Sequence, residues 1–173
     1  MHPKAMKVIE WPDIRLLKAP KQITDFSNEE FKLNNLIVDM MATAVEYNTT
    51  GISANQVGLH LALIVLRLPM KDGSSHPIVM VNPQITVASK ETMEFEDGSI
   101  STPDYFHKTN RPRSITVRYQ DNKGNTVETQ FEGIYAFMVH HDIDTMNGNI
   151  FAKDLNMLAK SRLKRKLLNK KHR

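Results

Sequence analysis

Cysteine is absent from this chain of 173 residues, and its absence excludes two kinds of structure at once. No disulfide can form, and no metal ion can be held by a thiolate. Long apolar runs are missing as well, since no stretch approaches the roughly 20 apolar residues that a membrane-spanning helix needs. The N-terminal sequence MHPKAMKVIEWPD lacks the apolar core of a signal peptide. We therefore expect no secretory signal, no membrane contact and a cytoplasmic location.

Acidic residues are missing from the C-terminal end. Residues 159–173 carry eight Lys or Arg and no Asp or Glu, which leaves 15 basic and 19 acidic residues in the rest of the chain. Such asymmetry indicates a polyanionic partner, for which we expect RNA or a ribosomal surface, and the alternative is a solvated helix end. Residues 152–173 contain no aromatic residue, so any RNA contact there would be made to phosphate without base stacking.

Apolar residues make up 40% of the chain, which is enough for a hydrophobic core. Domains are commonly about 100–150 residues long, so the length favours a single domain. We expect this domain over residues 1–155. A basic amphipathic helix or tail is expected over residues 156–173.

Two segments have helical periodicity. In residues 26–48, Ser27 and Glu30 fit a capping box, and apolar residues follow at helical spacing. These are Phe31, Leu36, Met40, Met41 and Val45. In residues 134–148, apolar residues recur at steps of three and four, and Gly148 suits the helix end. These are Ala136, Val139, Ile143 and Met146.

Strands are expected between these helices. Residues 61–68 and 76–85 are rich in β-branched and aliphatic side chains, and residues 114–133 alternate like a hairpin around the turn sequence DNKGN. Strands that follow one another without regular βαβ alternation predict an α+β fold. A last amphipathic helix is expected over residues 152–171. Its apolar face would hold Leu155, Leu158, Leu163 and Leu167.

Three motifs occur in order along the chain. GISANQVG occupies residues 51–58, EDGSISTP residues 96–103 and HHDIDTMNG residues 140–148. With WPDIRL near the N-terminus, they make residues 6–155 resemble the peptide deformylase family. The resemblance implies a deformylase-like fold, with mixed or antiparallel sheets around a central helix that carries HHDIDT.

The family removes the formyl group from N-terminal formyl-methionine of nascent chains, using Fe²⁺ or Zn²⁺ held by one Cys and two His. A metal-bound water serves as nucleophile because the ion lowers its pKa to around 7. By resemblance, Gly51 and Ile52 line the substrate site, and Gln56 and the backbone N–H of Ile100 stabilise the oxyanion. Asp142 stands in the position of the catalytic Glu.

The metal ligands of the family are mostly replaced in this chain. Ser99 stands in the Cys position and Thr145 in that of the second His, so only His141 keeps a ligand-type side chain. A serine hydroxyl is neutral at pH 7 and lacks the thiolate that suits these metals. His140 lies about 100° around the expected helix from His141 and cannot replace Thr145 without rearrangement. Asp142 is one methylene shorter than Glu, which draws the base back by about 1.5 Å.

Three hypotheses follow. The main one is a deformylase-like protein without a cofactor or deformylase activity that binds formyl-Met peptides or nascent-chain N-termini near the ribosome, with Ser99, Ile100 and His141 in its substrate site. The second is an active peptide deformylase with an altered Fe²⁺ or Zn²⁺ site that uses His141 and Asp142, with or without His140. The third is a metal-free hydrolase with Ser99 as nucleophile and His141 as base, oriented by Asp142 or Asp144.

Each of these residues also has a purely structural interpretation. His141 can be a hydrogen-bonded interior histidine and His140 a rim residue, while Ser99 can fill the volume of the thiol and Gln56 can hold loop backbone. Asp142 and Asp144 can be structural carboxylates. By resemblance, Asp144 pairs with Arg111 and braces the helix. Whether the chain is an enzyme is left open by the sequence.

Overall fold

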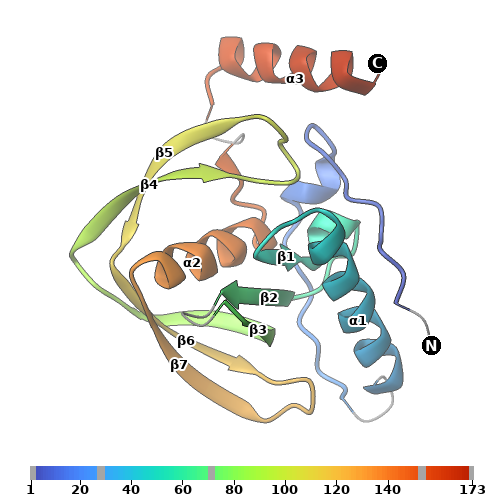
Figure 1. Cartoon of the computed structure of the whole chain (residues 1–173), viewed down its shortest axis with the longest axis vertical. Coiled ribbons are helices and arrows are strands. Elements are labelled where there is room, and N and C mark those ends of the chain that lie inside the picture. The colour runs from blue at the N-terminus through green and yellow to red at the C-terminus, as the bar shows by residue number, and fades with distance from the viewer. Residues whose placement is uncertain (1–2, 27–29, 70–72, 152–154, 172–173) are drawn as a thin grey trace.

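Helix α2 (Ile134–Met146) occupies the centre of the molecule, with strands around it and the other two α-helices farther out (Figure 1). The computed structural model describes residues 3–26, 30–69, 73–151 and 155–171. None of the helices in these ranges has the length and hydropathy to cross a membrane.

The strands form two antiparallel sheets. The larger sheet has five strands in the order β1-β2-β3-β6-β7, and the smaller one pairs β4 with β5. The strands of the larger sheet are β1 (Gly51–Ser53), β2 (Leu63–Pro69), β3 (Ser75–Ala88), β6 (Ser114–Gln120) and β7 (Thr126–Glu132). Those of the smaller sheet are β4 (Thr92–Gly98) and β5 (Phe106–Pro112). The predicted α+β class with antiparallel sheets is confirmed.

The predicted strands and the hairpin are present, whereas three strands were not foreseen. β4 and β5 are rich in polar residues, and every second side chain of each is exposed, so neither has an apolar run that marks a strand. They gain their backbone hydrogen bonds from each other, through a seven-residue antiparallel register. β1 lies in the motif that we expected to be a loop, and three residues are too few for a periodic pattern to show.

The main core lies between the five-stranded sheet and α2. All four apolar positions predicted for this helix are buried, and they pack on β-strand residues such as Leu66, Met80 and Val117. The helix begins after Gly133 and ends before Gly148, whose φ of +75° takes the left-handed conformation expected at a helix end.

Helix α1 (Glu30–Glu46) covers the opposite face of β1 and β2. Met40 is buried as predicted, but Val45 is 56% exposed, and the prediction for that residue was wrong. The buried positions include Leu33 and Ala44, which lie seven residues before and four after Met40 and hence on the same side of the helix. Ser27, the predicted N-cap, lies outside the described residues.

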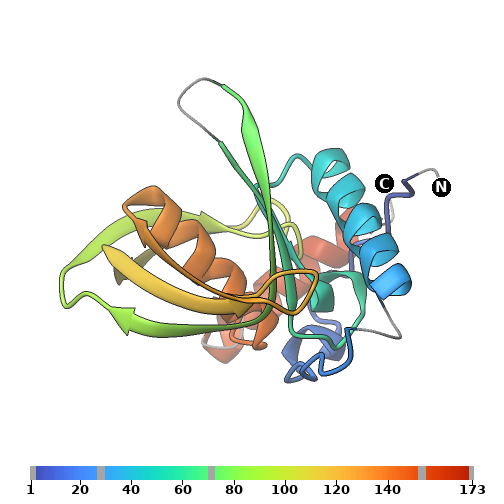
Figure 2. The ribbon, with the colours of Figure 1, turned by 90° about the horizontal axis from the view of Figure 1, so that it is seen from below.

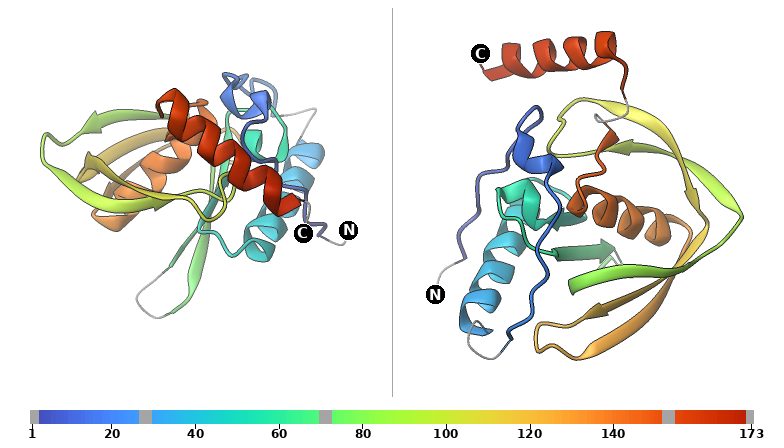
Figure 3. Two further views of the ribbon diagram at one scale, coloured as in Figure 1. Left: turned by 90° about the horizontal axis from the view of Figure 1, so that it is seen from above. Right: turned by 180° about the vertical axis from the view of Figure 1, so that it is seen from behind.

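Helix α3 (Met157–Lys171) lies across the outside of the molecule, near the 3₁₀ helix η1 (Ile14–Leu17) (Figure 3). Leu163 and Leu167 are buried against Leu16 and Ile150, as the amphipathic pattern predicted. Leu158 is 61% exposed, so its assignment to the apolar face was wrong. Five residues separate Leu158 from Leu163, which places the two about 140° apart around the helix.

The hairpin formed by β2 and β3 extends away from the rest of the molecule (Figure 2). Near its base, β2 pairs with β1, which carries the first motif. The sheet therefore holds the start of the motif loop in a fixed position against the central helix.

Candidate active site

All three sequence motifs meet at one cavity of about 180 Å³ between β1, the loop after β4 and helix α2. The five-stranded sheet contributes Gly51, and the 3₁₀ helix η2 (Ala54–Val57) contributes Gln56. The loop after β4 contributes Ser99 and Ile100, and α2 contributes His141 and Asp142. Its apolar walls include Ile134, Phe137 and Met138.

Gly51 is required by the close approach of α2. A Cβ atom on this residue would lie 2.0 Å from Oδ2 of Asp142 and 2.8 Å from Cδ2 of Leu66. Because side chains alternate along a strand, the next residue, Ile52, points to the opposite face and is buried in the core under α1. Ile52 was predicted to bind substrate, but its side chain does not line the cavity.

The amide of Gln56 is fixed from both ends. Its Oε1 accepts the backbone N–H of Ser53 at 3.0 Å, while Nε2 donates to the hydroxyls of Ser99 at 3.2 Å and Ser101 at 3.3 Å. The N–H of Ile100 makes no hydrogen bond within the described residues. The N–H of Ile100 and the amide of Gln56 thus lie at the same cavity, and both N–H groups of the Gln56 amide are engaged by serine hydroxyls. Their role in oxyanion stabilisation stays a prediction.

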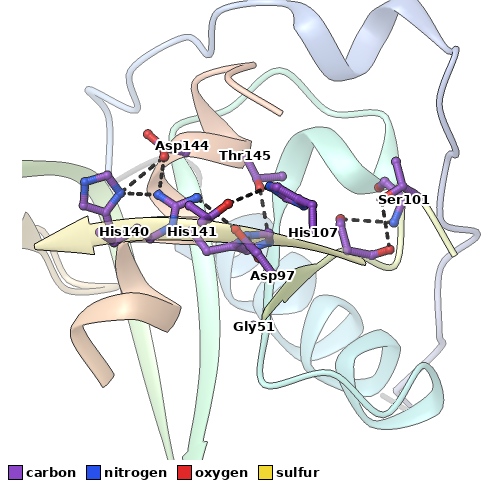
Figure 4. A network of polar contacts seen from close by, with 12 residues as sticks. Gly51, Asp97, Ser101, His107, His140, His141, Asp144 and Thr145 are labelled. Carbon is purple, nitrogen blue, oxygen red and sulfur yellow. Dashed lines mark hydrogen bonds and ion pairs between the residues drawn. The ribbon is translucent and has the colours of Figure 1, made fainter. Parts of the chain in front are cut away.

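His141 is bonded on both sides of its ring (Figure 4). Its Nδ1 lies 2.7 Å from Oδ1 of Asp97, and its Nε2 lies 3.4 Å from the Thr145 hydroxyl. The hydroxyl of Ser99 is instead bonded to Gln56 and to the backbone N–H of Ser101. The Ser99–His141 pair required by the third hypothesis is therefore not formed among the described residues.

Arg111 on β5 joins the smaller sheet to α2. Its Nη2 donates to Oδ2 of Asp97 at 3.1 Å, and its Nη1 pairs with Asp144. His140 lies 3.2 Å from the same Asp144 carboxylate through its Nδ1 (Figure 4). His140 thus contacts this ion-paired group and does not line the cavity described above. It lines a neighbouring cavity with Ser99, His141 and Thr145, and its use as a metal ligand stays a prediction.

Burial and neighbouring charges shift the pKa values of Asp97 and His141 in opposite directions. Burial would raise the pKa of Asp97, but hydrogen bonds and the charges of His141 and Arg111 hold it below its usual range. Burial would lower the pKa of His141, but the hydrogen bond to Asp97 and the charge of Asp142 raise it above its usual range. The lowered pKa of Asp97 and the raised pKa of His141 have one cause, because a carboxylate and an imidazolium stabilise each other's charge.

Asp142 behaves differently because burial dominates. Its side chain is deeply buried, and the loss of solvation raises the pKa of its carboxyl to about 6, against an ordinary value of 3.8. A carboxyl with such a pKa is ionised at neutral pH and is basic enough to accept a proton from water.

The side chains at the family's ligand positions do not fit its metal ion. They are the imidazole of His141 and the neutral hydroxyls of Ser99 and Thr145, in place of a thiolate and two imidazoles. Sites for Zn²⁺ and similar ions need about three side chains of nitrogen, sulfur or carboxylate type. Within the described ranges, no group of three His, Cys, Asp or Glu side chains is arranged to hold a metal ion.

Asp97 is a residue of the cavity that the sequence interpretation missed. Its Oδ1 lies 2.7 Å from Nδ1 of His141, whereas the orienting residues that we considered were Asp142 and Asp144. A signal was present in the sequence, because Asp97 follows Met93 and Phe95 at the alternate positions of β4 that point inward. An acid at an inward position indicates a buried partner, but the signal could only be used once β4 was known to be a strand.

Comparison with known proteins agrees with the motifs. The family model described as polypeptide deformylase matches residues 5–161. The curated peptide deformylase of Cellvibrio japonicus is 30% identical over 168 residues, which cover 97% of this chain and 96% of that protein. The crystal structure of a peptide deformylase from Legionella pneumophila matches with a TM-score of 0.84 and 33% identity over 97% of this chain and 96% of the other. That from Ehrlichia chaffeensis matches with a TM-score of 0.87, 28% identity and 98% coverage of both chains.

The fold and the site together define a protein of the deformylase type, in which the central helix carries His141 and lies beside residues 51–58 with Gly51 and Gln56. This chain belongs to the polypeptide deformylase family. Our main expectation, a protein without a cofactor or deformylase activity, is not supported by these comparisons. The alternative of an active deformylase fits them better, in a family that the resemblance describes as metal-dependent.

Proposed function

We propose that this protein removes the formyl group from peptides that begin with formyl-methionine. The observation that carries the proposal is the meeting of amide donors, a carboxyl base and apolar walls at one cavity of about 180 Å³. Relatives that are 30% and 33% identical over more than nine-tenths of this chain are named peptide deformylase, which supports the same activity.

The cavity has the parts needed to bind the N-terminal residue of such a peptide. Ile134, Phe137 and Met138 provide an apolar wall for a methionine side chain. The N–H of Ile100 is a donor for the formyl oxygen. The amide of Gln56 becomes a second donor when its hydrogen bond to Ser99 or Ser101 is exchanged for one to the substrate. Because Ser53 holds the other end of the Gln56 amide, this exchange needs no reorientation of the side chain.

Asp142 provides the base in this proposal. Its carboxylate accepts a proton from the water that attacks the formyl carbon, and it can return that proton to the departing amine. The raised pKa of about 6 suits both directions of transfer near neutral pH. Because the side chains at the family's ligand positions do not fit a metal ion, Asp142 is the group that activates the water in this proposal.

Hydrolysis of formyl-Met-Ala-Ser tests the proposal directly. Formate release by the wild type should rise between pH 5 and pH 7 with a midpoint of about 6, as Asp142 ionises. Asp142→Asn should lower the rate at pH 7.5 by at least about 100-fold, the usual contribution of a general base. Glu128→Gln, at an exposed position of β7, is the matched control and should keep the rate. Peptide binding without formate release by the wild type would overturn the proposal.

We also propose that α3 brings the protein to an RNA phosphate surface, such as that of a ribosome. Leu163 and Leu167 face the body, so the exposed side chains of Arg162, Lys164 and Arg165 point to solvent. Contacts between cations and phosphates release counterions and weaken as salt rises.

Charge removal on α3 tests this second proposal. A variant with Arg162, Lys164 and Arg165 changed to Gln should bind ribosomes more weakly and with a smaller salt dependence, by roughly one unit of slope for each lost phosphate contact. The control variant changes Lys90, Arg113 and Arg118 to Gln, which removes the same charge from exposed positions elsewhere. Equal weakening in both variants, or in neither, would contradict a docking role for the helix.

A further inference from the structure

We propose that a hydrogen-bonded chain of Asp97, His141 and Thr145 takes the place of the metal ion in this site, so that the site is complete without a bound metal. The state of this centre is independent of the proposed hydrolytic activity. Ser99, His141 and Thr145 stand at the family's ligand positions.

Two of these positions carry hydroxyls that are already engaged. The Thr145 hydroxyl lies 3.4 Å from Nε2 of His141, the ring nitrogen that does not face Asp97. The Ser99 hydroxyl accepts from Nε2 of Gln56 and from the N–H of Ser101, both at 3.2 Å. A metal ion at this point would have to break these contacts and would gain only neutral oxygen ligands in return.

Two of the three carboxylates near His141 are paired as well, and the third, Asp142, is the proposed base, whose charge also acts on His141. Oδ1 of Asp97 contacts His141, and its Oδ2 accepts from Arg111 at 3.1 Å. Arg111 also pairs with Asp144, which in turn contacts His140. Both carboxylates therefore have cationic or imidazole partners. Neither is left as an uncompensated buried charge that would attract a divalent cation.

Burial preserves the arrangement. The side chains of Asp97 and His141 are 5% and 19% exposed, and Thr145 as a whole is 2% exposed. Hydrogen bonds in such surroundings compete little with water, and their groups would be costly to leave unpaired. The hydrogen-bonded chain thus joins β4 to α2. In a metal-bound site, an ion with ligands from both segments would make this connection.

Metal binding by the wild type and by the Ser99→Cys/Thr145→His variant tests the proposal. The variant restores a thiolate and a second imidazole, so it should bind about one Co²⁺ per chain in equilibrium dialysis and unfold at a higher temperature when Co²⁺ is present. The wild type should retain no metal after anaerobic purification, and neither Co²⁺ nor a chelator should change its unfolding temperature. Stoichiometric metal in the wild type that is lost in His141→Ala would overturn the proposal.

A second measurement keeps the test decisive if the double variant does not fold. Thr145→Val keeps the side-chain shape but removes the hydroxyl, so the ¹⁵N resonance of His141 Nε2 should shift while that of His60, outside the site, stays in place. An unchanged His141 resonance would overturn the hydrogen-bonded chain.

Formate release, measured on the same metal-free samples, separates the two proposals. Turnover without metal supports both. Absence of metal together with absence of turnover overturns only the proposed function, and turnover that needs metal overturns only the metal-free centre.

Discussion

The carboxylate of Asp142 lies where a side chain at position 51 would begin, so the two residues depend on each other. The carboxylate occupies the space where any other residue at position 51 would place its Cβ. The same burial that fits it there removes its hydration and raises its pKa to about 6. The geometry of one backbone position thus sets the chemistry of a side chain from a distant part of the sequence.

Asp142→Asn should change how stability depends on pH. The folded-state pKa of Asp142 is about 6, above the ordinary 3.8, so the folded chain binds this proton more tightly than the unfolded one. The resulting stabilisation is complete below about pH 4 and is lost as the pH rises through about 6. Between pH 4 and pH 7.5, the variant should gain up to about 3 kcal/mol over the wild type in free energy of unfolding, measured in urea. Parallel pH profiles of the two proteins would contradict the raised pKa.

Gly51→Ala should damage the site more than the fold. The new methyl group would meet the Asp142 carboxylate and Leu66, which costs about 1–3 kcal/mol of stability as in other overpacked sites. Displacement of the base should lower formate release by at least about 10-fold. Gly73→Ala is the control, because nothing lies within 4 Å of its Cβ, although its φ of +81° costs about 1 kcal/mol. Equal activity of the two variants would show that the close approach is unimportant.

Helix α3 differs from α1 and α2 in how it is held. The central helix is enclosed by strands, whereas α3 is anchored by Leu163 and Leu167 on a small cluster with Leu16 and Ile150. A small contact of this kind lets the helix present its cations outward. It also makes the position of the helix sensitive to a few side chains.

Leu163→Ala together with Leu167→Ala should release α3 from the body. Truncation of a buried leucine costs about 2–5 kcal/mol of stability. Two such truncations should exceed the free energy that holds α3 on the body through its small contact. We expect rapid cleavage by trypsin within residues 157–171, with the circular dichroism of the strands retained. Leu158→Ala, at a position that is 61% exposed on the same helix, should be cleaved like the wild type. Global unfolding of the double variant would show instead that α3 is part of the main folding unit.

The walls of the cavity come from separate parts of the fold, namely the five-stranded sheet, the loop after β4 and the central helix. A ligand that touches all three should stabilise the native state as a unit. At a concentration 100 times its Kd, formyl-Met-Ala-Ser should add about 2.7 kcal/mol, or roughly 5–11 °C in Tm, to a catalytically silent Asp142→Asn variant. The unformylated peptide Met-Ala-Ser is the control and should give a smaller shift. Equal shifts would show that the formyl group is not recognised.

Several features of the fold could be predicted because local patterns carry them. The stripe of Ala136, Val139, Ile143 and Met146 defined the buried face of the central helix, and the alternation of residues 114–133 defined the hairpin. β4 and β5 could not be predicted, since their polar sequences pair with each other and only one face is covered. Val45 and Leu158 were misassigned because a broad apolar stripe does not fix which side of a helix finds a partner.

The order of the three motifs was sufficient to indicate the family. It also predicts Asp142 as the base and places Ser99 and Thr145 at two ligand positions. The partners of these residues depend on strand pairing between distant segments. The register of β4 with β5 brings Asp97 to Arg111 and His141, and the packing of α2 on β1 buries Asp142 against Gly51. A sequence records which groups are present, whereas burial and distance arise only when the sheets and the helix come together. For this reason the side chains at the ligand positions could be read from the sequence, whereas the hydrogen bonds of His141 to Asp97 and Thr145 could not.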